Sequence, residues 1–159
     1  FVRGGCRKVM QFYGGLERKK SANIRHEGME RVLRENGCEV ISVNMEWDAM
    51  SYAYNKNIIL KYWDIIRDTD GCMTNDIGAL SCLAVARKMG LAIPEQFKII
   101  GYDGTEITNL TYPELSVVEQ DCPALAKECV DAVLQLIQNK EPESMLRIVP
   151  IHWRERGTT

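Results

Sequence analysis

The sequence predicts an α/β domain built on an open parallel sheet with helices on both faces. From Lys8 onward, short strand-like apolar runs alternate with amphipathic stretches of helix length, which is the signature of βαβ units. Of the 159 residues, 45% are apolar and 26% are charged, as in ordinary globular domains that bury one core. Neither internal repeats nor low-complexity tracts interrupt this alternation.

The charge balance and the apolar runs argue against two classes of function. Lysine and arginine number 20 against 22 acidic residues, a net charge of −2, whereas sequence-independent binding of nucleic acid needs a basic surface. No apolar run approaches the roughly eighteen residues of a membrane span, and no signal peptide is visible after Phe1. We therefore expect a cytoplasmic protein with no membrane contact, which reaches DNA only through another module.

The cysteines follow no metal-binding or redox spacing. No C-x-x-C pair occurs, so neither a zinc ribbon nor a thioredoxin-like motif is predicted. Several of them lie inside apolar helix or strand patterns, where a free thiol behaves as a small hydrophobe. We expect free thiols in a reducing compartment, with three disulfides as the weaker alternative. The six are Cys6, Cys38, Cys72, Cys82, Cys122 and Cys129.

The first predicted elements are a strand, a helix and a second strand. Lys8–Tyr13 forms the first strand in this prediction. Ser21 is placed to cap a helix that runs to Asn36, and Gly37 ends that helix as a left-handed residue. The second strand is Val40–Met45.

A second helix and a short third strand should follow. Asp48 or Ser51 is expected to cap the helix, and Gly71–Thr74 forms the strand. Apolar residues recur along the helix at intervals of three and four, which predicts a single buried face. The residues of that face are Tyr54, Ile58, Tyr62, Ile65 and Ile66.

The third helix, from Asp76 to Met89, is apolar almost all round. A helix of this kind is covered on two sides, by the sheet and by a second element. Gly90 ends it, and Ile93-Pro94 turns the chain into a fourth strand at Lys98–Tyr102.

The last third of the chain should contribute two strands and a long helix. Leu115–Glu119 is a strand, and Pro123 favours the first position of a helix that runs to about Asn139. Met145–Trp153 closes the sheet at an edge, because it contains Pro150. One face of the helix is apolar, formed by Leu125, Cys129, Ala132, Val133, Leu136 and Ile137.

Polar residues directly follow the ends of the predicted strands, which lie at one edge of the sheet. In an open parallel sheet the ligand crevice lies outside the carboxyl ends of the strands. Fixed carboxylate, amide and guanidinium groups around an aromatic face suit a neutral sugar or polyol. The strand exits are Gly14-Gly15, Glu46-Trp47-Asp48, Asn75-Asp76 and Asp103-Gly104, with Arg25 nearby in the first turn of its helix.

Each of these residues also has an ordinary structural interpretation. Asn75 and Asp76 can cap the next helix, which for Asp76 is favoured over ligand contact. Trp47 can be a core or rim aromatic, and Arg25 a solvated helix residue paired with an acid. Asp103 before Gly104 can be a simple turn pair.

Signs of catalysis, nucleotide binding or metal binding are sparse. Gly14-Gly15 matches neither dinucleotide nor P-loop spacing. His26 and His152 are the only histidines, and we interpret the first as a solvated helix residue and the second as a half-exposed strand residue. No local catalytic motif includes either of them. We expect neither an enzyme, nor a bound metal, nor a cofactor.

Two consecutive stretches carry a specific family resemblance. Residues 70–80, DGCMTNDIGAL, and residues 87–104, RKMGLAIPEQFKIIGYDG, closely resemble the effector-binding core of the lac/galactose repressor (LacI/GalR) family of bacterial transcription regulators. The segments 112–120 and 150–159 agree with that family in order and spacing, so the similarity covers essentially the whole chain.

The resemblance implies a periplasmic-binding-protein-like (type I) fold, of which this chain supplies mainly the C-terminal lobe. Residues 1–119 would form that lobe, residues 120–141 a crossover and a helix belonging with the N-terminal lobe, and residues 142–159 a closing strand and tail. DNA would be bound by a helix-turn-helix headpiece outside this sequence, and effector-driven lobe closure would control that binding.

The resemblance also implies roles for individual residues. Arg25, Asn75, Asp103 and Gln120 correspond to polar effector contacts, and Trp47 to the aromatic that stacks on the ligand, a sugar or similar small polar molecule. The chain departs from the family at three positions. Cys6 stands where histidine is common, Gly104 where a second acid is frequent, and Cys122 where an aromatic can close the pocket.

A homodimer is the expected assembly. Its surface would comprise the almost wholly apolar third helix and the loop after the fourth strand, with Leu80, Leu83, Ala84, Thr111 and Tyr112 as contacts. A periplasmic sugar-binding protein of a transport system stays open as an alternative function, and an enzyme on a doubly wound sheet as a third.

Overall fold

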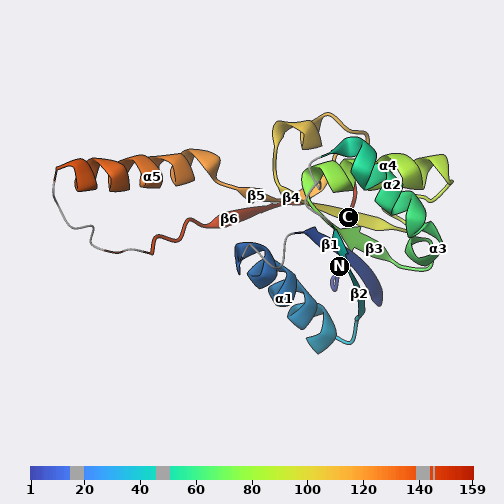
Figure 1. Cartoon of the computed structure of the whole chain (residues 1–159). Coiled ribbons are helices and arrows are strands. Elements are labelled where there is room, and N and C mark those ends of the chain that lie inside the picture. The colour runs from blue at the N-terminus through green and yellow to red at the C-terminus, as the bar shows by residue number, and fades with distance from the viewer. Residues whose placement is uncertain (15–19, 46–50, 139–143, 145) are drawn as a thin grey trace.

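The structure is a computed structural model that describes residues 1–14, 20–45, 51–138, 144 and 146–159, without the side chains of residues 20–23. A body of sheet and helices carries an arm formed by the helix and returning segment near the C-terminus (Figure 1). The strands are β1 Lys8–Gly14, β2 Glu39–Met45, β3 Gly71–Met73, β4 Lys98–Asp103, β5 Ser116–Gln120 and β6 Ile151–Arg154. The helices are α1 Lys20–Glu35, α2 Tyr52–Lys61, α3 Trp63–Ile66, α4 Asp76–Lys88, the 3-10 turn η1 Glu106–Asn109 and α5 Cys122–Ile137.

The strands form one sheet in the order β2-β1-β3-β4-β5-β6. All neighbours are parallel except β5 and β6, which pair antiparallel. Helix α1 lies on one face, and α2 and α4 lie on the other (Figure 1). This confirms the predicted sheet with helices on both faces. The closing strand lies at an edge as predicted, but it is shorter, and Pro150 directly precedes it.

Two apolar clusters fill the space between the sheet and its helices. The larger joins the sheet to α2 and α4 and includes Phe97 and Met10, both fully buried. The smaller lies under α1, where Leu33 packs on Val9 and Val40. Strand β1 therefore has a buried apolar residue on each face, as expected for a central strand.

The predicted single helix after Ser51 is wrong, because the chain forms α2 and then the short α3, with Tyr62 between them. The change of direction alters which residues face the core. Ile65 is 40% exposed, whereas Ile59 is 2% and Asn55 1% exposed. The predicted residues Tyr54, Ile58 and Tyr62 pack against the core and Ile66 is fully buried, so of the predicted face only the placement of Ile65 is wrong.

The helix ends follow local capping chemistry. Ser51 accepts a hydrogen bond from the Tyr54 N–H at 3.2 Å, as predicted, while Asp48 lies outside the described residues. Helix α1 begins at Lys20, one residue before the predicted cap Ser21. Gly37 follows it at a φ of 77°, as predicted for a left-handed residue.

Helix α4 was predicted to pack against the sheet and against a second element, and that element is α2 of the same chain. The apolar character of α4 on two sides is therefore satisfied without a second protomer. Leu83 is 4% exposed and belongs to the core, so assigning it to a dimer surface was wrong. Leu80 is partly buried against that core, and Ala84 is exposed.

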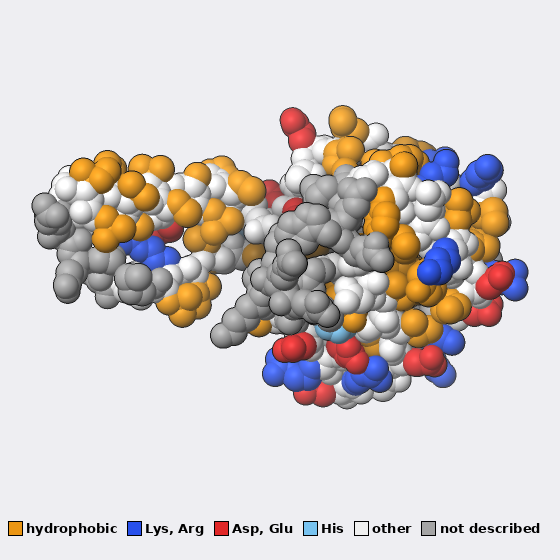
Figure 2. All heavy atoms as spheres, in the orientation of Figure 1, with side chains coloured by type: hydrophobic (Ala, Val, Ile, Leu, Met, Phe, Trp, Pro, Cys, Tyr) orange, Lys and Arg blue, Asp and Glu red, His pale blue; other side chains and the backbone are white. Residues whose placement is uncertain are grey.

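Helix α5 contrasts with the body because none of its residues is buried. Apolar side chains lie along its exposed surface (Figure 2). The helix is capped by Asp121, whose carboxylate accepts from the Ala124 N–H, and Pro123 stands at its second position rather than its first. The predicted end at Asn139 lies outside the described residues.

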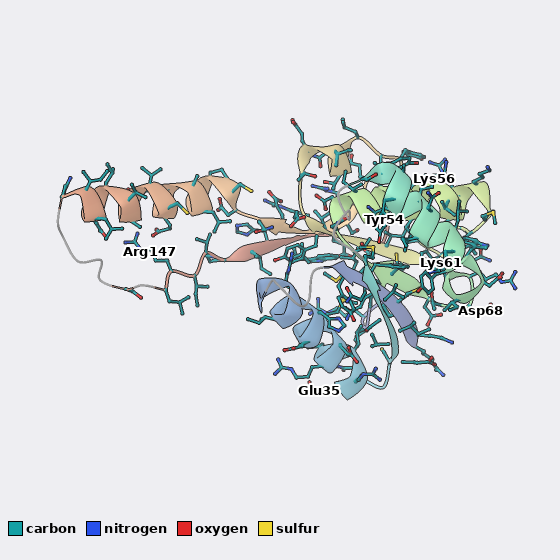
Figure 3. All side chains as sticks on the ribbon, viewed as in Figure 1. Glu35, Tyr54, Lys56, Lys61, Asp68 and Arg147 are labelled. Atoms are coloured by element: carbon teal, nitrogen blue, oxygen red, sulfur yellow. The ribbon has the colours of Figure 1, made fainter. Side chains whose placement is uncertain are left out.

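Among the described residues, the hydrogen bonds between α5 and the segment that returns from it all come from Arg147. Arg147 points toward α5 (Figure 3), and its guanidinium donates to the Glu128 carboxylate and the Gln135 amide oxygen, both at 2.8 Å. These bonds leave the apolar side chains of α5 exposed, among them Val133, Leu136 and Ile137.

The cysteines are free thiols, as predicted. Cys72 and Cys82 are buried together with their sulfur atoms 3.3 Å apart, while Cys122 and Cys129 are exposed. In the part of the chain that the structure describes, every helix is too short or too polar to span a membrane. Within the same residues, no group of three or more His, Cys, Asp or Glu side chains is arranged to hold a metal.

Candidate functional site

The site lies at the carboxyl ends of β4 and β5, beside the first half of α1. These two strands are paired, with Asp103 directly opposite Glu119 and Gln120 one residue further along. Arg25 reaches the same place from α1. Parallel pairing therefore brings together residues that are far apart in the sequence.

Three of the predicted ligand contacts form one cluster. Gln120 Nε2 donates to Asp103 Oδ1 at 2.6 Å, and Arg25 Nη1 lies 3.7 Å from the same oxygen. The Arg25 side chain is 43% and the Asp103 side chain 33% exposed, so both are open to an incoming molecule. Arg25 and Asp103 thus form a partly exposed ion pair, so Arg25 is a helix residue paired with an acid, and that acid lies at the predicted rim.

Tyr102 is a member of the cluster that the sequence analysis missed. The Arg25 guanidinium lies 4.0 Å above the centre of its ring, a favourable cation–π arrangement. Because side chains alternate along a strand, the residue before Asp103 points to the opposite face of the sheet, toward α1. That alternation was the signal that could have identified it.

The turn after β4 has an unusual backbone. Asp103 has a φ of 111° and Gly104 a φ of 75°. A positive φ in a residue other than glycine is uncommon, costs free energy, and often marks a functional site. A Cβ on Gly104 would lie 2.6 Å from the Cα of Glu119, which explains why a second acid cannot occupy position 104 with this backbone.

The acids around this turn are harder to ionise than usual. Burial raises the pKa of Asp103, and the nearby Asp76 charge raises it further, while Arg25 and Gln120 act in the opposite direction. Burial also raises the pKa of Asp76, opposed mainly by its hydrogen bonds from Thr105. Asp103 therefore accepts a proton at a higher pH than an ordinary aspartate.

Of the two residues after β3, Asn75 has the capping role that the sequence allowed, whereas Asp76 does not. Asn75 is the N-cap of α4, and its side-chain oxygen accepts from the Gly78 N–H at 2.7 Å. Asp76 does not cap the helix; it accepts hydrogen bonds from Thr105 instead. Trp47, the predicted stacking aromatic, lies outside the described residues.

His26 is not the solvated helix residue that the sequence suggested. Its ring stacks on Tyr13 with centroids 3.9 Å apart, and its Nδ1 contacts the side-chain amide of Gln11. Nε2 lies 3.3 Å from a Glu30 oxygen. Gln11 is 3% exposed within β1, so a buried amide fixes the face of α1 next to Arg25.

His152 behaves as predicted. It lies in β6 with its side chain 48% exposed, and its Nε2 is 3.7 Å from an Asp121 oxygen. The contact is too exposed and too long to mark a catalytic pair.

The chemical character of the cluster is polar and close to charge-neutral. Arg25 supplies donors, Asp103 supplies acceptors, and the Gln120 amide supplies a donor and an acceptor. Groups of this kind bridge adjacent hydroxyls of a small uncharged molecule.

Comparisons with known proteins agree with this architecture. The sequence profile of the periplasmic binding protein-like domain matches residues 1–159. The transcriptional repressor PurR of Vibrio vulnificus (strain CMCP6) is 28% identical over 156 residues, which are 95% of this chain and 45% of that protein. The lactose operon repressor of Escherichia coli (strain K12) is 28% identical over 140 residues, 87% of this chain and 38% of that protein.

Solved structures give the same result. A periplasmic binding protein/LacI transcriptional regulator from Alkaliphilus metalliredigens QYMF, in complex with D-xylulofuranose, superposes with a TM-score of 0.88 at 26% identity, covering 99% of this chain and 58% of that one. A dimeric lac repressor with an 11-residue C-terminal deletion gives 0.83 at 27% identity, covering 99% and 57%. This chain thus spans from 38% to 58% of the length of these four proteins.

Proposed function

The chain belongs to the periplasmic binding protein-like domain family, among the effector-binding domains of LacI-type regulators, and from this we propose that it senses a small polar effector for a bacterial transcription regulator. The observation that carries the proposal is the convergence of Arg25, Asp103 and Gln120 at the carboxyl edge of the sheet. The regulator would be cytoplasmic, and the chain would have no catalytic role.

The proposed effector is a sugar or a molecule with similar hydroxyl groups. Arg25 would donate to it, Asp103 would accept from it, and Gln120 would orient the carboxylate as well as contact the ligand. Asn75 joins this set as a proposed contact that also caps α4, and Trp47 as a proposed stacking aromatic. The complex of the similar Alkaliphilus metalliredigens protein with D-xylulofuranose supports this class of ligand.

We propose that residues 1–119 act as one lobe of a two-lobed domain. Residues 120–141 would cross to the N-terminal lobe, and residues 142–159 would return. The absence of any buried residue in α5 supports this division, because an amphipathic helix normally packs its apolar face against a partner.

Effector binding between two lobes would favour their closed arrangement. A ligand shifts such an equilibrium only by its difference in affinity for the open and closed states, typically about 1–3 kcal/mol of coupling. Closure would reposition a DNA-binding headpiece carried elsewhere in the protein, so DNA is an indirect partner of this chain.

The proposed assembly is a homodimer that uses Leu80, Ala84, Thr111 and Tyr112. Tyr112 is 83% exposed, and the neighbouring Leu110 is 81% exposed, so this loop offers apolar surface of the kind that marks interfaces. Sedimentation of the whole regulator at micromolar concentration should give a dimer, and a monomer there would contradict the assignment.

Calorimetric titration of the whole regulator with a panel of sugars and purines tests the proposed function. We expect one sugar-like compound to bind, and Arg25→Ala to weaken that binding by about 10- to 100-fold, the usual effect of losing a charged hydrogen bond. Arg31→Ala is the matched control, because Arg31 is exposed on the same helix and should leave the affinity unchanged. Equal losses in both variants would exclude the proposed site.

A further inference from the structure

Asp76 is a buried acid that the proposed ligand contacts do not include. Its side chain is 2% exposed, and its two oxygens have different surroundings. Oδ2 accepts from the Thr105 N–H at 2.6 Å and from the Thr105 hydroxyl at 2.7 Å. Oδ1 is buried without a hydrogen-bond partner among the described residues, next to the backbone of Gly101.

Thr105 is the residue that follows the strained turn at the end of β4. Asp103 and Gly104 both have positive φ, and the turn presses against the backbone of β5 at Glu119. A backbone of this kind persists only when its surroundings hold it. The two hydrogen bonds from Thr105 to Asp76 hold the end of this turn that follows Gly104. The Asp76 carboxylate therefore connects the first turn of α4 with the end of β4.

An ordinary reason for an acid at this position is the start of α4, where the helix dipole favours negative charge. That reason accounts for an exposed acid, whereas burial of Asp76 costs free energy and raises its pKa. The two hydrogen bonds that Asp76 accepts from Thr105 offset part of this cost.

We propose that Asp76 is a positioning residue for effector binding, which holds Asp103 at the rim through Thr105 without touching the effector. This inference rests on the proposed function for its biological meaning. Its physical content is testable without any ligand, so failure to find an effector leaves the test intact.

The experiment uses the full chain and two readouts, amide hydrogen exchange at Thr105 and the NMR titration of the Asp103 carboxyl carbon. Asp76→Ala removes both acceptors, so Thr105 should exchange about 10- to 100-fold faster. Asp76→Asn keeps an oxygen for Thr105 but removes the charge, so exchange should change little. Glu106→Ala, in the exposed start of η1, is the control for exchange and should leave Thr105 unchanged.

The carboxyl titration separates electrostatic positioning from a purely structural effect. The charges next to this pair are those of Arg25 beside Asp103 and Arg156 near Asp76. Because the Asp76 charge raises the pKa of Asp103, the Asp103 midpoint in Asp76→Asn should move to lower pH. Asp76→Ala and Asp76→Asn both lack this charge, so a difference between their Asp103 midpoints reports movement of Asp103 relative to Arg25 and Gln120. Equal midpoints in the two folded variants would overturn the proposal.

The exchange readout has its own decisive outcome. Unchanged exchange at Thr105 in folded Asp76→Ala would also overturn the proposal. If that variant does not fold, Thr105→Val replaces it, because this change removes only the hydroxyl bond. Faster exchange at Gly104 and at position 105 would then support the proposal, and wild-type exchange would refute it.

Discussion

The body and the arm of this protein are built from the same kinds of sequence pattern but reach opposite states of burial. In the body, α4 buries most of its residues between the sheet and α2. In the arm, α5 has one apolar face, whereas α4 is apolar almost all round, and none of the α5 residues is buried. Figure 2 shows the apolar side chains that lie along the exposed surface of α5.

The difference teaches that periodicity identifies an apolar face but not the surface that covers it. Helix α4 finds its cover within the chain, so its stability belongs to the folding of the body. Helix α5 depends on its own backbone hydrogen bonds and on the ion pair of Arg147, and isolated helices of this length are marginal in water.

Core truncation should give the largest contrast between the two regions. Phe97→Ala removes a fully buried ring and should lower the free energy of unfolding by about 3–5 kcal/mol. Ile137→Ala removes a side chain that is 70% exposed and should change it by less than about 0.5 kcal/mol. Urea denaturation of the chain measures both. A loss above about 2 kcal/mol for Ile137→Ala would mean that the arm is packed in solution.

A pair of glycine substitutions should sharpen the comparison at the rim of the body. Both Gly104 and Gly90 have positive φ, but a Cβ would meet Glu119 only at Gly104, and open space at Gly90. Gly90→Ala should therefore cost about 1–2 kcal/mol from its backbone alone. Gly104→Ala should cost at least about 1 kcal/mol more because of the overlap. Equal losses of unfolding free energy in Gly104→Ala and Gly90→Ala would show that β5 shifts to make room for the added Cβ at position 104.

Loss of a helix cap should have different consequences in the two regions. Ser51→Ala and Asp121→Ala each remove one N-cap hydrogen bond, worth about 1 kcal/mol. In α2 that loss should appear in global unfolding, because α2 folds with the core. In α5 it should appear only as faster amide exchange in the first turn. A drop in global stability for Asp121→Ala would show that the arm unfolds together with the body.

The smallest expected effect is on the pH dependence of body stability. Because the pKa of Asp103 is raised in the folded state, the folded protein binds this proton more tightly than the unfolded chain. Its contribution to stability therefore falls as pH rises from the ordinary aspartate range through the raised pKa. Asp103→Asn cannot ionise at this position, so it avoids the loss of stability at high pH. The melting temperature of the variant should be modestly higher than that of the wild type at pH 7, and this difference should shrink toward pH 4. A lower melting temperature at pH 7 would contradict this sign.

The sequence predicted much of the site because topology and local chemistry agree there. Asp103 was predicted from its place at the end of a strand and Gln120 from the family resemblance, and in the structure the pairing of β4 with β5 brings the two together. Tyr102 and His26 were missed because their partners come from another element. The hydrogen bonds from Thr105 to Asp76 depend on the turn at the end of β4. That turn has a positive φ at Asp103, which no residue pattern predicts.

The sequence by itself determined the alternation of strands and helices and the free thiols, because these depend on residue spacing and local chemistry. Only the tertiary structure decided that the helix after Ser51 breaks at Tyr62, that Leu83 belongs to the core, and that α5 stands uncovered. Burial depends on which surfaces meet in three dimensions, and the pattern of one segment carries no information about its partner.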